Sequence, residues 1–446
     1  MSIHQGSIHA VMSLLVMSLL WVSMASEARD TTPKLEKAPN ASVETILSGF
    51  AELPPDVDAF PNQSNMDLYA WREFIALNWP AAPGTCEPDR SRTFLDTKGP
   101  RVWETWLQPS DVFVPPGEAP ARWCSAREER ARLGKIQQSV GGVLVDQNGR
   151  FVRYEVRLNE DAYNYLLANN LWNKAGQREA TINLPAGPDD KFCKDQSCGP
   201  VGTVEVKAAW KVLGQGDDPS RFYTIEAEVY NDDLVPPTAS PDPNPVTLGL
   251  VGLHIAHKTA SQRSWLWATF EHVDNVTKSF NNPDCPETPS YTPNPPRPCT
   301  TRCCAPNAPT AAKDPETKTY VELDPFGQPL HRPTQVTRLR GPSSQRLNKH
   351  FKVLFGNSPW SNYELISNQW MGINPQTPTP TYLANTVMET FIQGQHPASD
   401  GIPAYPAPGY NPFSTRTSSS CIKCHSVAKT TSGRSADFSF LFSGAQ

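Results

Sequence analysis

Three residues close to the end of the 446-residue chain, Cys421, Cys424 and His425, have the types and the spacing needed to hold a prosthetic group. They lie in the stretch Ser-Cys-Ile-Lys-Cys-His, and Cys-x-x-Cys-His is the attachment motif of a c-type haem. Two thiols one helical turn apart can each form a thioether bond with a haem vinyl group, while the adjacent histidine reaches the iron from the same side. The motif therefore predicts one covalent haem c, bound through both cysteines, with His425 as the proximal iron ligand.

Two other uses of such cysteines agree less well with the sequence. A redox-active Cys-x-x-Cys pair usually accompanies a βαβ pattern, which is absent here. A zinc site would need a matching second pair of ligands. The proline-rich segment 281–318 contains four cysteines, but no histidine lies between residues 273 and 330. Covalent haem is therefore the favoured interpretation.

The late position of the motif restricts the choice of a sixth iron ligand. In the common small cytochrome c domain the motif comes early and a methionine ligand follows it, whereas residues 426–446 contain neither Met nor His. A distal ligand of either type must come from upstream, and we expect it to be Met388, His254 or His272. The other methionines and histidines of the mature chain are weaker candidates: Met66, Met371, His257, His331, His350 and His396.

His254 and His272 lie on two consecutive predicted strands that are joined around residue 262. If the strands pair so that His254 opposes Phe270, His272 is the next residue on the same face of the sheet. The two histidines would then serve as a distal ligand or as a catalytic acid/base pair that faces the haem. The alternative is that both are hydrogen-bonded structural histidines. His257 is an odd number of residues from His254 and belongs on the opposite face.

The secondary-structure pattern predicts an α+β fold with an antiparallel, β-rich body that resembles a meander or a sandwich. Extended runs are expected at 202–213, 221–230, 246–259 and 264–274. Helices are expected at 64–79, with Ser64 as its cap, at about 160–175, and after residue 340 at 343–356, 358–372 and 381–394. This divides the chain into a signal peptide at 1–25, a β-rich body at 26–340 and a helical haem-attachment region at 341–446, the last either separate or integrated with the body.

Residues 140–158 predict a β-hairpin, because Asn148-Gly149 is a strong turn signal between two extended runs. In the second run apolar residues alternate with three charged ones. One face of this strand is therefore expected to be buried and the other to be solvated, with the solvated face carrying Arg153, Glu155 and Arg157.

The N-terminus predicts export. Residues 11–24 form the only long apolar run, which is short for a membrane span and is followed by small residues. We interpret residues 1–25 as a secretory signal peptide and expect a periplasmic protein with no membrane span in the mature chain. An uncleaved anchor is the alternative, because residues 1–10 contain no Lys or Arg. The eight cysteines outside the motif are then expected to form disulfides. A net charge of −5 without a basic block argues against nucleic acid as a partner.

Several segments together resemble a group of secreted bacterial c-type cytochrome-like proteins. The resemblance rests on GLHIAHKT at 252–259, WLWATFEHVDN at 265–275 and the C-terminal SCIKCH, with EFIALNWP, RVWETW and NTVMET in support. It implies a monohaem protein exported to the periplasm, but it supplies neither a substrate nor a sixth ligand.

Three functions are compatible with such a chain. The first is electron transfer with a redox partner protein or a small-molecule electron donor or acceptor. The second is a haem-dependent oxidoreductase of the peroxidase or oxidase type, with substrate chemistry between the β body and the haem. The third is a non-catalytic protein in which the haem mainly stabilises the fold. Ligation and access at the sixth iron position distinguish the first two.

Overall fold

The fold is taken from a computed structural model of the chain, in which residues 39–446 form one compact unit. The structure describes these residues: 43–57, 62–125, 131–138, 142–190, 199–214, 216–229, 245–276, 307, 334, 336, 338, 344–372, 377–391 and 420–446. The predicted signal peptide, the proline-rich segment 281–318, His331 and His396 lie outside this part, except for Asn307 within that segment.

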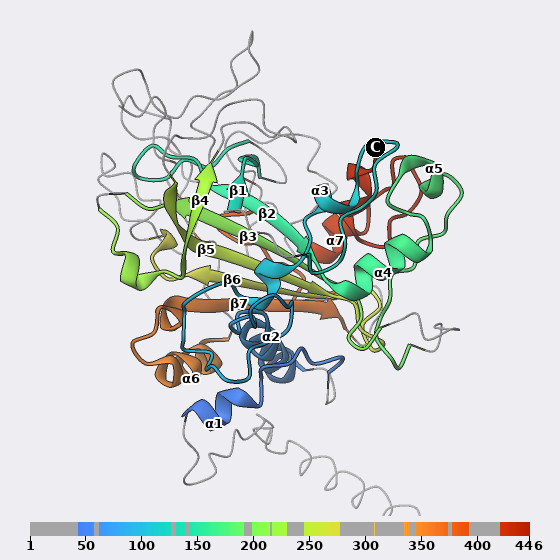
Figure 1. The fold of residues 1–446 in the computed structure, drawn as a ribbon. Helices are drawn as coiled ribbons and strands as arrows, with labels where there is room; N and C mark the ends of the chain where they lie inside the picture. Colours follow the sequence, from blue (N-terminus) through green and yellow to red (C-terminus); the bar gives the residue numbers. More distant parts are fainter. Residues whose placement is uncertain are drawn as a thin grey trace, which may run out of the picture. The chain divides into compact units, whose positions relative to one another are not determined.

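An eight-stranded sheet forms the centre of this unit (Figure 1), which confirms the predicted α+β class with a β-rich body. All neighbouring strands are antiparallel except the parallel pair β1 and β4. The strands are β1 (Ala131–Leu133), β2 (Arg153–Leu158), β3 (Val204–Val212), β4 (Thr224–Val229), β5 (Val246–His257), β6 (Leu266–His272), β7 (Tyr363–Met371) and β8 (Pro378–Thr379).

The strand order differs from a simple meander, because β5 pairs with three strands. Its 12 residues pair with β3 along one edge, while β6 and β4 share the other edge. β3 therefore lies beside β5, although β4 comes between them in the sequence. From β5 onward, β6, β7 and β8 follow in chain order.

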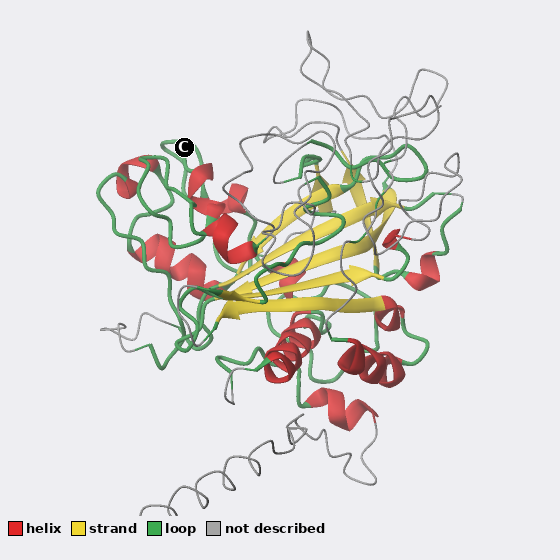
Figure 2. Cartoon of the chain, turned by 180° about the vertical axis from the view of Figure 1, so that it is seen from behind, coloured by secondary structure: helices red, strands yellow, loops and turns green. Residues whose placement is uncertain are grey.

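Helices flank the sheet and are mostly short (Figure 2). The predicted helix at 64–79 is confirmed as α2, but Asn62 rather than Ser64 caps it, since Asn62 Oδ1 accepts a hydrogen bond of 3.0 Å from the Asn65 amide. The helices are α1 (Val43–Ser48), α2 (Gln63–Leu77), α3 (Pro109–Val112), α4 (Glu160–Ala168), α5 (Lys174–Gln177), α6 (Gln345–Phe355) and α7 (Cys421–His425).

The two faces of the sheet pack against different segments. On one face, which we call the α2 face, α2 and α6 cover Leu253, Phe270 and Leu365 in a large aromatic core. On the other, the α7 face, the C-terminal segment 420–446 packs with α3 and α4 against Ala256 of β5 and Trp267 of β6. Figure 1 shows this segment in red beside α3, α4 and α5.

Two of the helices predicted after residue 340 are wrong. Residues 363–371, inside the predicted helix 358–372, form β7, which pairs with β6. Residues 381–391 contain no helix within the described part, because tertiary hydrogen bonds replace helical ones: Asn385 Nδ2 donates to the Phe270 carbonyl, and Tyr154 donates to the Val387 carbonyl. The region 341–446 is thus not a helical unit. The third helix, 343–356, is confirmed as α6 with Gly356 as its C-cap.

A single glycine lets the segment 385–389 lie against the α7 face. A Cβ atom at Gly252 of β5 would come within 2.8 Å of Val387 Cγ2 and 3.2 Å of Met388 Cε. Such distances are shorter than a van der Waals contact between carbon atoms. The missing side chain is therefore what allows the close approach.

The hairpin turn at Asn148-Gly149 is confirmed, but the solvated face predicted for its second strand is wrong. The Asp146 amide bonds to the Arg150 carbonyl across the turn, and Gly149 takes the positive φ of 75° that the turn needs. Arg153, Glu155 and Arg157 are all buried. The segment before α3 covers two of them: Arg157 donates to the Trp106 carbonyl, and Gln108 donates to Glu155. Glu155 pairs with Arg157 at 2.7 Å, which compensates both charges.

The helix predicted at 160–175 is shorter than expected. α4 ends at Ala168, where Asn169 donates from its side chain to the Tyr165 carbonyl and Asn170 takes a left-handed φ of 55°. Asparagine tolerates this conformation and commonly ends a helix.

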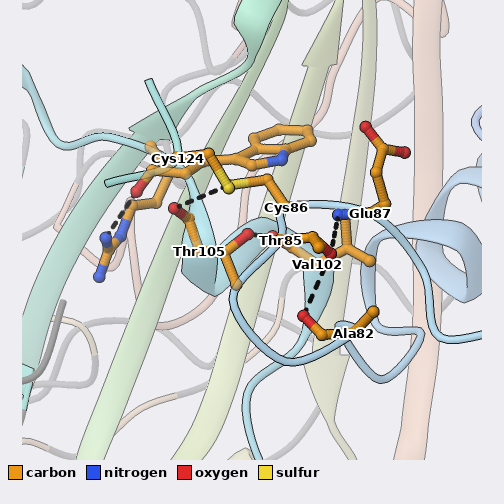
Figure 3. Close-up of a disulfide and its surroundings, with 9 residues drawn as sticks. Ala82, Thr85, Cys86, Glu87, Val102, Thr105 and Cys124 are labelled. Carbon is orange, nitrogen blue, oxygen red and sulfur yellow. Dashed lines mark hydrogen bonds between the residues drawn. A yellow bond between two sulfur atoms is a disulfide. The ribbon is translucent and has the colours of Figure 1, made fainter. Parts of the chain in front are cut away.

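One disulfide lies in the described part, as expected for cysteines outside the motif, and it links Cys86 to Cys124 with a Cα–Cα distance of 5.7 Å (Figure 3). The Cys86 sulfur lies 3.6 Å from the Thr105 carbonyl oxygen. The remaining six cysteines outside the motif lie beyond the described residues. No helix in the described ranges is long and apolar enough to cross a membrane.

Candidate haem-attachment site

The motif Cys421–His425 forms the short helix α7, and strand β7 holds its first turn. Ser420 is the N-cap and donates to Gln369 Oε1 at 3.1 Å, and the same oxygen accepts from the Ile422 amide at 3.0 Å. The buried side chain of Ile422 anchors α7 on the α7 face. One residue of the sheet therefore fixes how the motif approaches it.

Both thiols of the motif are free, and each is half-buried beside the sheet. Burial raises the pKa of Cys421 well above its ordinary value and that of Cys424 to about 11, and the negative charge of Glu389 acts in the same direction. Both are thus neutral thiols at neutral pH rather than thiolates, which are the form that binds zinc and attacks disulfides. They lie on one turn of a helix, as attachment to one macrocycle edge requires.

His425 is oriented by a hydrogen bond and by two aromatic side chains. Its Nδ1–H donates to the Phe438 carbonyl at 2.8 Å. Its ring lies 4.2 Å from the ring of Trp267 and 5.0 Å from that of Phe440, measured between centroids. Burial lowers the pKa of His425 to about 4, so the imidazole is neutral. With Nδ1 protonated, Nε2 carries the lone pair, which is the tautomer that a metal-ligating histidine needs.

Polar side chains of the central strands face α7. Lys207 of β3 lies directly opposite His254 of β5, and Glu205 follows on the same face. These three side chains are half-buried, whereas their neighbours along both strands are buried. The charge of Lys207 acts on both Cys424 and His425. A polar, partly accessible strip of the sheet therefore lies at the motif.

Glu389 joins this strip from the segment that passes over Gly252. Its Oε2 atom lies 3.4 Å from His254 Nε2. Burial acts to raise the pKa of Glu389, but its interaction with His254 and the positive charge of Lys207 outweigh burial, and the pKa is lowered. Glu389 is thus a carboxylate that faces the His254 imidazole and the Lys207 ammonium group next to the haem motif.

The structure brings His254 to the motif and places His272 elsewhere. The predicted register of β5 and β6 is wrong by one residue: His254 opposes Thr269, and Leu253 opposes Phe270. Because side chains alternate along a strand, this shift puts His272 on the α2 face. There it stacks on Phe222 at 4.1 Å, and its ring bonds to the Arg221 carbonyl and the Asp274 amide.

The remaining candidate ligands divide by face. His257 lies opposite His254, as predicted, and contacts Tyr69 and Glu73 of α2. Met388 lies on the α7 face but is fully buried in an apolar cluster over Gly252, as an ordinary core residue would be. Two of the others lie apart from the motif: Met66 is buried next to Leu266 and Trp370, and His350 lies on α6. Met371 lies beside the motif, because it and Cys421 are half-buried against the apolar cluster that contains Ile422.

Sequence reasoning missed four contributors to the site: Lys207, Gln369, Glu389 and the carbonyl of Phe438. Lys207 had no distinctive signal, since it alternates with apolar residues in the same way as a solvated side chain of a strand. Gln369 and Glu389 were hidden, because both fall in segments whose pattern predicts helices. A backbone carbonyl leaves no signal in the residue type.

The side chains at α7 fit a covalent haem: two free thiols on one turn, and a neutral imidazole that is held through Nδ1. Within the described ranges, no group of three or more His, Cys, Asp or Glu side chains is arranged to hold a metal ion by itself. Comparison of the chain with protein-family models, with curated sequences and with solved structures finds no match, so the function must be inferred from the geometry of this site.

Proposed function

We propose that this protein is a periplasmic monohaem c-type cytochrome that acts in electron transfer. One observation carries the proposal: His425 follows two free thiols on a single helical turn and donates from Nδ1 to the Phe438 carbonyl at 2.8 Å. This is how a proximal histidine is held when its Nε2 atom binds iron. The export signal predicted at 1–25 agrees with the proposal, because the same compartment would attach the haem.

In this proposal each residue of the site has a defined task. Cys421 and Cys424 form the thioether bonds, and His425 binds the iron, which supplies the change between ferric and ferrous states when the haem is bound. Trp267 and Phe440 pack on the imidazole and help to fix its orientation. Electrons would pass to a redox partner protein or to a small-molecule donor or acceptor.

The test is the loss of covalent haem on removal of both thiols. In a host that attaches haem c, Cys421→Ala with Cys424→Ala should abolish the pyridine-haemochrome absorbance of the denatured protein. The matched control is Cys86→Ser with Cys124→Ser, which also removes two cysteines but leaves α7 intact. That control should keep its haem, although loss of a cross-link over 38 residues should lower the free energy of unfolding by about 4 kcal/mol. A denatured double alanine variant that still carries haem would contradict the proposal.

A second candidate function is a haem-dependent oxidoreductase of the peroxidase or oxidase type. The observation in its favour is His254, a half-buried imidazole beside the motif whose Nε2 atom lies 3.4 Å from Glu389 but makes no hydrogen bond of good geometry with any described residue. An imidazole beside a carboxylate is a common acid/base pair.

The spin state of the ferric haem distinguishes the two functions. A six-coordinate, low-spin haem that does not react with cyanide or peroxide supports electron transfer. A high-spin haem that binds either ligand supports the oxidoreductase, with His254 as the distal acid/base group.

A further inference from the structure

The backbone that presents the Phe438 carbonyl to His425 has an unusual conformation. Asp437 and Phe438 have φ angles of 50° and 69°, so two consecutive residues with a Cβ atom lie in the left-handed region. This region is unfavourable for such residues and persists only where the surroundings impose it. The turn points the carbonyl at His425 Nδ1. What imposes the turn therefore also fixes the imidazole.

Two anchors hold the side chain of Asp437. Its Oδ2 atom accepts a hydrogen bond of 2.7 Å from the Leu184 amide and one of 2.6 Å from Lys258 Nζ. Lys258 directly follows the last residue of β5, and its side chain is only 1% exposed, against 14% for Asp437. Lys258 also donates to Asn183 Oδ1 at 2.9 Å. The turn is thus tied both to the central strand and to the segment that follows α5.

The position of this ion pair is informative, because a buried ion pair seldom contributes much net stability. Two buried charges must compensate each other, whereas two apolar residues of similar size would fill the same space without that requirement. Stability alone therefore does not explain why an ion pair is found at this position. The pair instead connects the sheet to the turn whose Phe438 carbonyl accepts the hydrogen bond from His425.

We propose that Lys258 and Asp437 are positioning residues for the proximal histidine: by holding the left-handed turn at 437–438, they keep the Phe438 carbonyl on His425 Nδ1 and so set the electron donation of the imidazole to the iron. This inference rests on the proposed haem attachment. A strong Nδ1–H bond increases the basicity of the ligand and favours the ferric state, while its loss favours the ferrous state. Loss of this hydrogen bond also frees the imidazole ring to rotate.

The experiment measures the haem rather than an activity. The loss variants are Lys258→Met, which keeps most of the side-chain volume, and Asp437→Ala, which removes both anchors. Lys258→Arg is the conservative variant. The matched control is Arg434→Gln. Arg434 lies in the same C-terminal segment as Asp437, and its ion pair with Glu179 is exposed on both sides. Each holoprotein is assayed for covalent haem, for its midpoint potential, and for the paramagnetic NMR shifts of the haem methyl groups, which depend on the plane of the axial imidazole.

We expect both loss variants to keep covalent haem, to have a midpoint potential above that of the wild type, and to show altered methyl shifts. Lys258→Arg and Arg434→Gln should match the wild type in all three. Wild-type potential and methyl shifts in a loss variant would overturn the inference, and if one loss variant fails to fold, the other decides. Absence of covalent haem from the wild type would instead overturn the proposed function itself.

Discussion

At the scale of single residues, one position of register decides which histidine belongs to the site. His254 and His272 both lie on buried central strands, so residue type alone does not separate them. The connection between β5 and β6 includes Trp265 with a φ of 67°, a conformation that no pattern assigns to tryptophan. That turn sets the pairing, and a shift of one residue moves every side chain to the other face.

The register predicts that replacing the two histidines affects different properties, the haem spectrum for His254 and the stability for His272. His254→Ala should change the absorption spectrum of the ferric haem, because the imidazole next to the motif is lost. His272→Ala should leave the spectrum unchanged but lower the free energy of unfolding by about 1 to 3 kcal/mol, since the buried Asp274 amide loses its acceptor and the Arg221 carbonyl loses one of its two donors within the described part. Absorption spectra and urea titrations of both holoproteins check this. A spectral change confined to His272→Ala would contradict the register.

At the scale of secondary-structure elements, the sequence identified the strands and helices with regular patterns. Strands β3 to β6, α2 and α6 follow from alternation or from helical spacing. β7 did not, because its buried residues include Asn368 and Gln369, and no alternation of apolar and polar residues survives in a strand that is buried on both sides. Tertiary hydrogen bonds compensate much of this burial: Asn368 Nδ2 donates to the Met66 carbonyl, and Gln369 Oε1 accepts from Ser420. Sequence patterns contain no information about such partners.

The hairpin turn before β2 predicts a pH dependence of stability. Asp146 is buried, its Oδ2 atom lies 3.4 Å from Lys211 Nζ, and Asp217 competes for the same ammonium group. Burial raises the pKa of Asp146 to about 6 from an ordinary value of 3.8. The folded state therefore holds this proton more tightly than the unfolded state, and stability falls as the pH rises from about 4 to about 6.

Asp146→Asn should remove this part of the pH dependence, because Asn keeps an oxygen for the Asn148 and Arg150 amides but never ionises. Relative to the wild type, its free energy of unfolding should rise by up to about 3 kcal/mol between pH 4 and pH 7. Urea titrations at several pH values measure it. Asp189→Asn, which removes an exposed carboxylate, is the control and should show no such trend. Parallel pH profiles for Asp146→Asn and the wild type would exclude the effect.

At the scale of the whole compact unit, the site combines segments that are distant in the sequence. β3 and β5 supply the polar strip, segment 385–389 supplies the carboxylate, and the last 27 residues described, 420–446, supply the motif and the turn that holds it. β7 lies within the sheet between β6 and β8. The boundary predicted at residues 340 and 341 would cut the sheet between two hydrogen-bonded strands.

A fragment of residues 341–446 should therefore not fold by itself. Without β6, strand β7 loses its main partner, and Leu365 and Trp360 lose the aromatic core on the α2 face. Circular dichroism should show no cooperative thermal transition for the fragment, while residues 26–446, produced in the same way, should show one. A cooperative transition in the fragment would establish it as a separate domain.

Gly252 has a consequence for the evolution of this protein. The absent side chain admits Val387 and Met388 and so determines how near Glu389 comes to His254. A descendant chain with a larger residue at 252 would have to move its acidic group or lose it. Substitutions at Gly252 and at 387–389 should thus occur together in related genes. Such correlated changes would show where the carboxylate beside His254 was gained or lost.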